Sequence, residues 1–371
     1  MAAKPKVAVV RCPDYERERV FASVKKAVDL VGGINAFVAP GMKVLVKPNI
    51  LSARPPEDAV DTHPEVVRAV ARLAKEAGGD VMIGDSPGGY GKNIDEAFEV
   101  SGIKKVAEEE GARLVRFSAS RQIEGMPIAT AALEADRVIS VPKLKTHSIT
   151  VLTAAVKNTF GMVTGLHKAE CHSRAPKAED LAKILVKVYA ITRPCLSVVD
   201  GIVAMDGDGP SAGRLRPLGA LLAGTDAVAI DACAARMAGL APLDVPVTKE
   251  AYARGLGEAD LGRIDLVGDD LNGFVMKDFA LPKTIRYLTM MPKPLLESFM
   301  YFVKFKPVID SGTCKRCGLC AETCPVDAIT VVNGVYKVDY HKCIKCLCCH
   351  EVCPYKAIEI KGNALTKLVW G

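Results

Sequence analysis

The chain has 371 residues, of which 49% are hydrophobic and 25% are charged. These proportions are typical of globular proteins and argue against extended disorder, and the length allows one large domain and one smaller one. The 49 basic and 43 acidic residues leave a formal net charge of +6 that is spread along the sequence. We therefore expect no nucleic-acid binding, which usually requires basic residues gathered into tracts.

Two features indicate the compartment in which the protein works. No apolar stretch approaches the roughly eighteen residues that span a bilayer, and the strand-like segment from Val7 to Val10 is not preceded by a secretory signal. Nine of the 13 cysteines lie between Cys314 and Cys353, at spacings typical of metal ligands rather than of disulfides. The sequence predicts a soluble, cytoplasmic protein in a reducing compartment, without membrane association.

The segment from Lys6 to about Val267 alternates short apolar stretches with longer amphipathic ones. This alternation predicts βαβ construction and an α/β domain over residues 1–280, with a three-layer, mostly parallel sheet covered by helices on both faces. Ligands of such sheets bind at the carboxyl ends of the strands. The expected strands are 7–10, 43–46, 81–83, 113–117, 137–141, 196–199, 218–223 and 264–267, and the clearest helices are 64–77, 178–192 and 225–238.

Polar side chains gather directly after several of these strands. We expect the strand ends to bring them together into a site for an anionic substrate or cofactor, where lysines bind the anion and a histidine transfers protons. Taken singly, each residue has a solvated loop charge as its alternative interpretation. The residues expected to bind the anion are Lys47, Asn49, Asp85, Ser86, Lys157, Asn158 and Asp200, and the expected catalytic residues are His147, Lys143 and Lys145.

The loop from Gly84 to Gly88 matches the G-x-S-x-G pattern of a hydrolase nucleophile. Pro87 argues against that function, because the oxyanion hole of the motif uses the backbone N–H after the serine and proline has none. The loop also departs from a phosphate-binding loop, since Asn93 stands where Ser or Thr is required. We interpret it as a ligand-facing loop, with a plain tight turn as the alternative.

Residues 281–307 differ in composition, because prolines alternate with lysines and large apolar residues. This pattern predicts an ordered connector between two domains, since an unstructured linker would not carry so many apolar groups. A helix lying in a membrane surface over residues 295–305 is the alternative, although the stretch is short and prolines interrupt the region.

The C-terminal region contains an internal repeat with the spacing C-x-x-C-x-x-C-x-x-x-C-P. A C-x-x-C-x-x-C loop can wrap three thiolates around one face of a cuboidal iron-sulfur cluster, and the fourth thiolate then comes from elsewhere. A zinc ribbon, which also uses paired C-x-x-C elements, is the alternative. The first run consists of Cys314, Cys317, Cys320 and Cys324, and the second run, offset by 29 residues from 314 to 343, consists of Cys343, Cys346, Cys349 and Cys353.

Between the two runs, Asn333-Gly334 is flanked by the strand-like segments 329–332 and 335–338, which is a strong hairpin signal. With this hairpin and the C-P-x-x-A-I ending of each run, residues 308–371 resemble bacterial two-cluster ferredoxins, which have a small α+β fold. The resemblance implies two 4Fe-4S clusters with crossed ligation. Cluster one would be held by Cys314, Cys317, Cys320 and Cys353, and cluster two by Cys343, Cys346, Cys349 and Cys324.

Two residues of the second run depart from the repeat. Leu347 stands where the first run has Gly318, so the conformation of that loop is open. Cys348 lies off the repeat, and we expect it to pack near a cluster as a small residue without ligating it.

The order of motifs along the chain also resembles the family known as domain of unknown function 362, which is often fused to a two-cluster ferredoxin. The resemblance implies an iron-sulfur protein of anaerobic-type metabolism, and it supplies no reaction. The motifs that carry it are Lys47-Pro48-Asn49, Thr62 to Arg68, Gly84 to Gly88, Lys143 to His147, Ala155 to Asn158 and Val199 to Ile202.

Three functions are compatible with these features. The leading hypothesis is an electron-transfer oxidoreductase, in which a redox partner protein feeds low-potential electrons through two clusters to an anionic small-molecule substrate or cofactor. A binding or cluster-delivery module for a metabolic enzyme is the first alternative. The second is a non-redox enzyme whose clusters serve structure or sensing. Two clusters favour electron transfer, because a purely structural role requires no relay.

Overall fold

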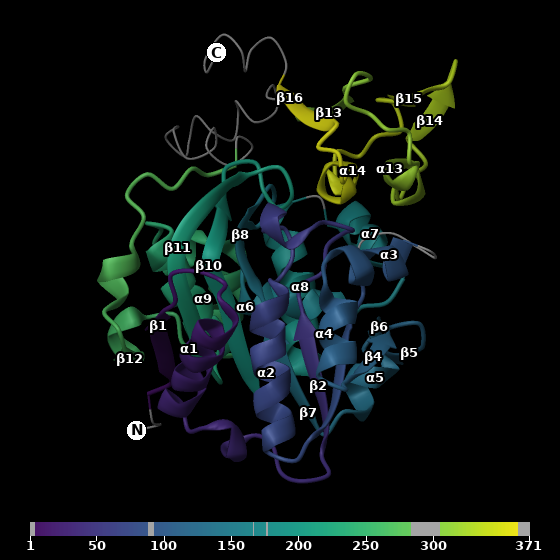
Figure 1. Ribbon diagram of the computed structural model, residues 1–371. Helices are drawn as coiled ribbons and strands as arrows, with labels where there is room; N and C mark the ends of the chain where they lie inside the picture. Colours follow the sequence, from purple (N-terminus) through teal and green to yellow (C-terminus); the bar gives the residue numbers. More distant parts are fainter. Residues whose placement is uncertain (1–3, 88–92, 166, 176, 283–304, 363–371) are drawn as a thin grey trace.

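The computed structural model describes residues 4–87, 93–165, 167–175, 177–282 and 305–362 (Figure 1). Most of the predicted connector lies outside these residues, as does the possible surface helix at 295–305 apart from its last residue, Phe305. Among the helices in the described ranges, none combines the length and the apolar character needed to cross a membrane.

The large domain is built on a ten-stranded sheet that contains all eight predicted strands. The strand order is β12-β1-β11-β10-β7-β2-β3-β4, and β11 is antiparallel to both β1 and β10 while the other pairs along this order are parallel. The predicted mostly parallel sheet is therefore confirmed. The bounds are β1 (Lys6–Arg11), β2 (Lys43–Pro48), β3 (Asp80–Asp85), β4 (Arg113–Arg116), β7 (Arg137–Val141), β10 (Leu196–Asp206), β11 (Arg214–Gly224) and β12 (Asp265–Gly268).

Helices cover both faces of this sheet and give the three layers (Figure 1). The central strands are buried on both sides, so they consist of consecutive apolar residues such as Val44, Leu45 and Val46, each 0% exposed. One face carries α1 (Arg17–Leu30), α2 (Pro64–Glu76), α3 (Asn93–Val100) and α4 (Ile103–Glu109). The other carries α5 (Thr130–Glu134), α6 (Ala155–Asn158), α7 (His167–Arg174), α8 (Ala178–Thr192), α9 (Ala227–Met237) and α10 (Pro246–Ala253).

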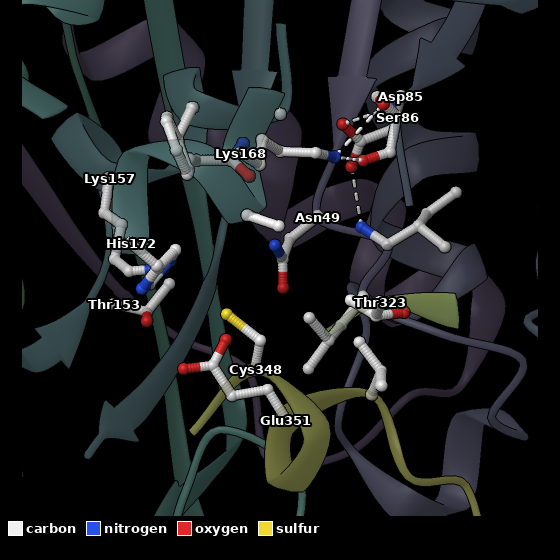
Figure 2. Close-up of a pocket in the computed structure, with 17 residues that line it drawn as sticks. Asn49, Asp85, Ser86, Thr153, Lys157, Lys168, His172, Thr323, Cys348 and Glu351 are labelled. Carbon is white, nitrogen blue, oxygen red and sulfur yellow. Dashed lines mark hydrogen bonds between the residues drawn. The ribbon is translucent and has the colours of Figure 1, made fainter. Parts of the chain in front are cut away.

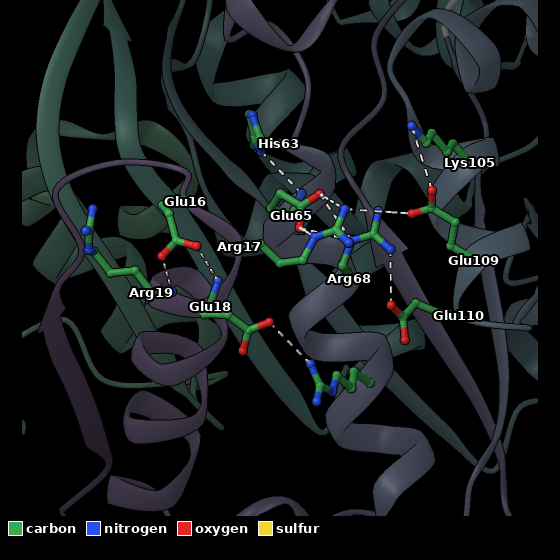
Figure 3. A network of polar contacts seen from close by, with 11 residues as sticks. Glu16, Arg17, Glu18, Arg19, His63, Glu65, Arg68, Lys105, Glu109 and Glu110 are labelled. Atoms are coloured by element: carbon green, nitrogen blue, oxygen red, sulfur yellow. Dashed lines mark hydrogen bonds and ion pairs between the residues drawn. The ribbon is translucent and has the colours of Figure 1, made fainter.

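A buried arginine ties three helices of the first face together (Figure 3). Arg68 of α2 is 5% exposed, and its guanidinium lies 3.0 Å from Glu65, 2.6 Å from Glu109 and 3.1 Å from Glu110. Arg17 of α1 reaches the same Glu65 carboxylate at 3.1 Å. Because each side of the buried charge meets a carboxylate, the network offsets the cost of removing the guanidinium from water.

The segment Lys143–His147 differs from expectation. It was expected to follow the fifth strand as a polar loop, but it forms β8 (Lys143–His147), which pairs with β10 and with β9 (Val151–Thr153). All five residues are buried, so their polar side chains meet partners inside the domain rather than solvent. The remaining strands of the large domain, β5 (Ser120–Ile123) and β6 (Met126–Ala129), form a separate hairpin.

The small domain has the predicted α+β construction. β13 (Phe305–Ile309) pairs with β16 (Ile358–Gly362), so the domain begins inside the segment assigned to the connector. β14 (Ile329–Val332) and β15 (Val335–Val338) form the predicted hairpin, with Asn333 at φ 52° and Gly334 at φ 70°, as a type I′ turn requires. The helices are α13 (Leu319–Glu322) and α14 (Cys348–Val352).

Leu347, which stands where the first run has Gly318, has the same backbone conformation as that glycine. Gly318 has φ 86° and Leu347 has φ 61°, so both runs use a left-handed residue before their short helix. Leucine at positive φ is strained by about 1–2 kcal/mol, and its burial to 5% exposure offsets part of that cost.

The small domain contacts the large domain through α14 and the residue that follows it. Ser211 Oγ donates to His350 O at 3.1 Å, Arg54 Nη2 donates to Cys353 O at 3.3 Å, and His147 Nε2 lies 3.1 Å from Glu351 Oε1. Arg54 belongs to the segment after β2, His147 ends β8 and Ser211 follows β10. The second cysteine run therefore faces the edge of the sheet where several strands end (Figure 1).

Candidate functional site between the two domains

A cavity of about 110 Å³ lies between α14 of the small domain and the carboxyl ends of β2 and β3 (Figure 2). This is the position at which open α/β sheets bind their ligands. The polar and sulfur-bearing residues that line it are Asn49, Asp85, Ser86, Thr153, Lys157, Asn158, Lys168, His172, Thr323, Cys348 and Glu351.

Lys47 and Asp85 form the floor on the large-domain side. Lys47 at the end of β2 is 0% exposed, and its ammonium lies 2.8 Å from Asp85 Oδ1 and donates to Asn158 Oδ1 at 3.2 Å. Asp85 Oδ2 accepts from Ile50 N at 2.7 Å, so the carboxylate also fixes the loop after β2. A Cβ at Gly161 would lie 2.2 Å from Asp85 Oδ1, which explains why glycine stands there.

Two further lysines line the cavity with different surroundings. Lys168 of α7 donates to Ser86 Oγ at 3.1 Å and to the carbonyls of Ser86 and Pro87. Burial lowers the pKa of Lys168 to about 8, against the opposing charge of Asp85. Within the described residues, the ammonium of Lys157 in α6 makes neither a hydrogen bond nor an ion pair, and burial lowers its pKa as well.

Four buried polar atoms of the cavity lining have no hydrogen-bond partner among the described residues: Asn49 Oδ1, Thr153 Oγ1, His172 Nδ1 and Glu351 Oε1, the last of which lies 3.1 Å from His147 Nε2. Buried polar groups are normally paired, and leaving one unpaired costs about 1–3 kcal/mol. Burial lowers the pKa of His172, so its ring is neutral at pH 7 and Nδ1 is free to accept or donate. The cavity therefore offers unused hydrogen-bonding capacity to a ligand.

The small domain supplies the opposite wall. Figure 2 shows the Cys348 sulfur and the Glu351 carboxylate pointing from α14 towards Asn49 and Lys157. Burial alone would raise the pKa of Glu351, but its contact with the His147 ring and the charge of Lys157 hold it well below its usual range. A buried carboxylate and a thiol thus face the lysines across the cavity.

His147 lies behind this wall and is not part of the cavity lining. Its Nδ1 accepts from the backbone N–H groups of Ile149 and Thr150, each at 3.2 Å, so its proton is on Nε2, facing Glu351. Burial and the charge of Lys157 lower the pKa of His147 to about 4. At neutral pH the ring is neutral, and its Nε2 contacts the Glu351 carboxylate of the small domain.

The other two residues expected to be catalytic are also outside the lining. Lys143 Nζ lies 2.8 Å from Asp200 Oδ2 and donates to Tyr15 Oη at 2.8 Å, in a buried cluster that also contains Tyr15 Oη donating to Asp200 Oδ1. Lys145 donates to Val60 O at 2.6 Å, and burial lowers its pKa to about 7. Strand pairing of β8 directs these side chains to internal partners.

The structure brings together half of the ten residues expected in the large domain. Asn49, Asp85, Ser86, Lys157 and Asn158 line the cavity, Lys47 lies directly beneath it, and Lys143, Lys145, His147 and Asp200 lie outside the lining. The polar and sulfur-bearing lining residues that the sequence analysis did not single out for this site are Thr153, Lys168, His172, Thr323, Cys348 and Glu351. The position of Cys348 outside the repeat was the only sequence signal among them.

The eight repeat cysteines surround two separate cavities in the small domain. One is lined by Cys314, Cys317, Cys320 and Cys353, and the other by Cys324, Cys343, Cys346 and Cys349, with Cys348 also in its wall. Each cavity therefore combines three cysteines of one run with the last cysteine of the other, the donor set of a cuboidal cluster.

Backbone N–H groups support the two crossing sulfurs in the same way. Ala328 N donates to Cys324 Sγ at 3.2 Å, and Ala357 N donates to Cys353 Sγ at 3.3 Å. Such N–H···S contacts orient thiolate ligands and tune the groups they hold. The residues present thus fit two 4Fe-4S clusters.

Each of the two domains matches a model of a known protein family. Residues 44–236 match the family model described as "Domain of unknown function (DUF362)", and residues 306–354 match a 4Fe-4S dicluster domain, which disfavours the zinc ribbon. The chain is 32% identical over 305 residues to the thylakoid-associated protein sll1697 of Synechocystis, covering 80% of this chain and 94% of that protein.

Solved structures show weaker similarity. The lactate racemase apoprotein of Thermoanaerobacterium thermosaccharolyticum gives a TM-score of 0.38 at 14% identity, and a Thermotoga maritima protein gives 0.37 at 12%. The matches cover 61% and 67% of this chain and only 55% and 61% of those chains. On the family match and the cyanobacterial relative, the chain belongs to the DUF362 family and carries a 4Fe-4S ferredoxin domain after its α/β domain.

Proposed function

We propose that this protein is an electron-transfer oxidoreductase in which two 4Fe-4S clusters deliver electrons to a small anion bound between the domains. The observation that carries the proposal is the position of Cys348, which lines both the cavity of cluster two and the interdomain cavity. A ligand in the interdomain cavity would be separated from cluster two by this one residue. When bound, such clusters supply one-electron transfer at low potential.

The lining of the cavity supports an anionic ligand. Lys157 presents an ammonium that no described residue pairs with, and Lys168 adds a second positive charge whose hydrogen bonds within the described ranges go to neutral oxygens. In a site largely shielded from water, ammonium groups bind carboxylate or phosphate oxygens strongly. The volume of about 110 Å³ restricts the ligand to a small molecule.

Other residues that line the same cavity can supply a proton and orient the ligand. The neutral ring of His172 presents Nδ1 to the cavity, where it can hold or pass a proton to a ligand that has gained charge. Thr153 Oγ1 can donate to an oxygen of the anion, and Asn49 Oδ1 can accept from a hydroxyl or N–H group of the ligand, since neither atom has a hydrogen-bond partner among the described residues. The buried Asp85 remains paired with Lys47 and keeps the floor in place.

The test is anaerobic reoxidation of the reduced holoprotein by a panel of small carboxylates and oxyanions. The account predicts that at least one anion reoxidises the clusters and that Lys157→Gln slows this reaction by about 10- to 100-fold, the cost of removing a charged hydrogen bond. Lys249→Gln, which neutralises an exposed lysine of α10, serves as the matched control and should leave the rate unchanged.

Two outcomes would count against the proposal. Failure of every anion to draw electrons would favour cluster delivery or a structural role of the clusters. Equal rates for Lys157→Gln and Lys249→Gln would remove the interdomain cavity from the reaction.

The redox partner, the absence of nucleic-acid binding and the cytoplasmic location stay predictions. The relative in Synechocystis is named as thylakoid-associated, which describes that protein. Separating membranes from the soluble fraction of cells that produce the present protein would test its location directly.

A further inference from the structure

The two cysteine runs differ in their exposure to solvent. Cys317 of the first run is exposed, whereas its counterpart in the second run, Cys346, is 8% exposed. The second run is covered because α14 packs against the large domain. Cluster one, which the structure fits to Cys317, is therefore the cluster with an open edge.

Basic and aromatic residues surround that edge. Lys315, Arg316 and Tyr355 line the cavity of cluster one and are exposed, Tyr355 by 44%, and the next residue, Lys356, is exposed too. These four residues and Cys317 are termed the cluster-one face. A surface of this kind, with an apolar centre and a basic rim, is suited to an acidic protein.

The acidic residues in the segment of the first run, residues 310–324, are Asp310 and Glu322. Asp310 is engaged by its own turn, since its Oδ1 accepts from Gly312 N at 2.7 Å and from Thr313 N at 3.2 Å. Glu322 ends α13, between Cys320 and Cys324, with Oε1 3.8 Å from the position that a Cβ on Gly318 would take. The cations Lys315 and Arg316 flank the exposed sulfur directly in sequence, so they dominate the field at the edge.

We propose that the cluster-one face is the docking site of an acidic one-electron donor protein and that electrons enter the molecule there. This inference rests on the proposed function for its direction, from cluster one to cluster two and the cavity. In each encounter the donor is oxidised by one electron and the acceptor site is reduced by one, and no bond or proton changes place. A second encounter supplies the second electron.

The test uses an acidic flavodoxin as the probe and measures its binding to the oxidised holoprotein by titration calorimetry at low and high salt. Lys315→Glu/Arg316→Glu reverses the two cations of the cluster-one face. Lys342→Glu/Lys345→Glu makes the same charge change beside the second run, where both lysines are exposed. This second double variant is the matched control for net charge.

The expected result is binding that weakens with salt and falls about tenfold or more in Lys315→Glu/Arg316→Glu, with a clearly smaller loss in the control. An equal or larger loss in the control, or binding indifferent to salt, would overturn the proposal. Iron content and the resting absorption spectrum of each variant must match those of the wild type, which excludes loss of a cluster as the cause.

Reduction kinetics provide the second readout. Electron entry from the reduced flavodoxin should slow in Lys315→Glu/Arg316→Glu, while entry from a neutral deazaflavin radical should keep its wild-type rate. Neither measurement requires an acceptor in the interdomain cavity. Failure of the donor protein to dock on the cluster-one face can therefore be distinguished from failure of an anion to be reduced in the interdomain cavity. If Lys315→Glu/Arg316→Glu slowed electron entry from both donors, the docking proposal would be overturned.

Discussion

The two cysteine runs have the same spacing and the same left-handed turn, yet their surroundings are opposite. Glu322 of the first run is exposed, while Glu351, its counterpart in the second, is 7% exposed and faces His147. Leu319 of the first run is likewise replaced by Cys348 in the second. The repeat cysteines are the same in both runs, and they determine that each run can contribute ligands to a cluster. The residues between these cysteines differ, and they determine whether the run contacts solvent or the large domain.

The crossed ligand sets give the largest expected effect. Cys324→Ser should remove cluster two and leave roughly half of the iron bound, although Cys324 belongs to the first run. Adding Cys346→Ser should then cost no further iron, because both cysteines line one cavity, whereas adding Cys320→Ser should remove the rest. Iron analysis and electron paramagnetic resonance check this. The reverse pattern would mean that each run ligates its own cluster.

Removal of Arg54 should loosen the second run from the large domain. Its guanidinium donates to Cys353 O and to Ser211 O and pairs with Asp58, so Arg54→Ala removes these contacts and leaves Cys353 O only the 3.4 Å hydrogen bond from Lys356 N. We expect a loss of about 2–3 kcal/mol in the opening free energy of α14, measured by hydrogen exchange.

Arg116→Ala is the control for this loss. Arg116 is exposed and pairs with Asp95 at the surface, so its loss should cost less than about 1 kcal/mol. Equal protection of α14 in Arg54→Ala and wild type would contradict the proposed role of Arg54.

Acidification should act on the contact between His147 and Glu351. The pKa of His147 is lowered to about 4 in the folded chain, below its ordinary value near 6.5, so the unfolded chain binds the additional proton as pH falls. Between pH 7.5 and 5.5 the wild type should lose about 1 kcal/mol of stability relative to His147→Gln. Denaturant titrations of both variants at the two pH values check this, and parallel pH dependences would refute it.

Exchange of the left-handed residues gives the smallest effect. Gly318→Ala places a Cβ at φ 86° and 3.2 Å from Tyr336 Oη, so we expect a loss of about 1 kcal/mol. Leu347→Gly relieves a similar strain but removes a buried side chain, so its net change should be a small loss. Denaturation midpoints of the two holoproteins compare them, and a clear gain for Gly318→Ala would contradict the equivalence of the turns.

The fold followed closely from the sequence because its signals are local and repeated. Apolar strands and the amphipathic pattern of Pro64–Glu76 are periodic, and Asn333-Gly334 allows few conformations. Only part of the candidate site could be predicted from the sequence. Lysines 143 and 157 look alike in sequence, but Lys143 is paired with Asp200 and Lys157 has no partner in the part of the chain that the structure describes. This difference depends on strand pairing and on a second domain.

The residues of α7 and α14 show the same limit. Lys168, His172 and Glu351 become neighbours only when the small domain covers the ends of β2 and β3. Nothing near them in the sequence marks them for a ligand, because a surface helix and a buried wall can share the same composition.

The central claim is that a small anion binds in the interdomain cavity beside cluster two. Electron-nuclear double resonance on the reduced holoprotein, equilibrated with ¹³C-labelled acetate as the probe, tests it most directly. The account predicts a ¹³C coupling to a reduced cluster that disappears in Lys157→Gln and persists in Lys249→Gln. A coupling that survives in Lys157→Gln, or no coupling at saturating acetate, would contradict it.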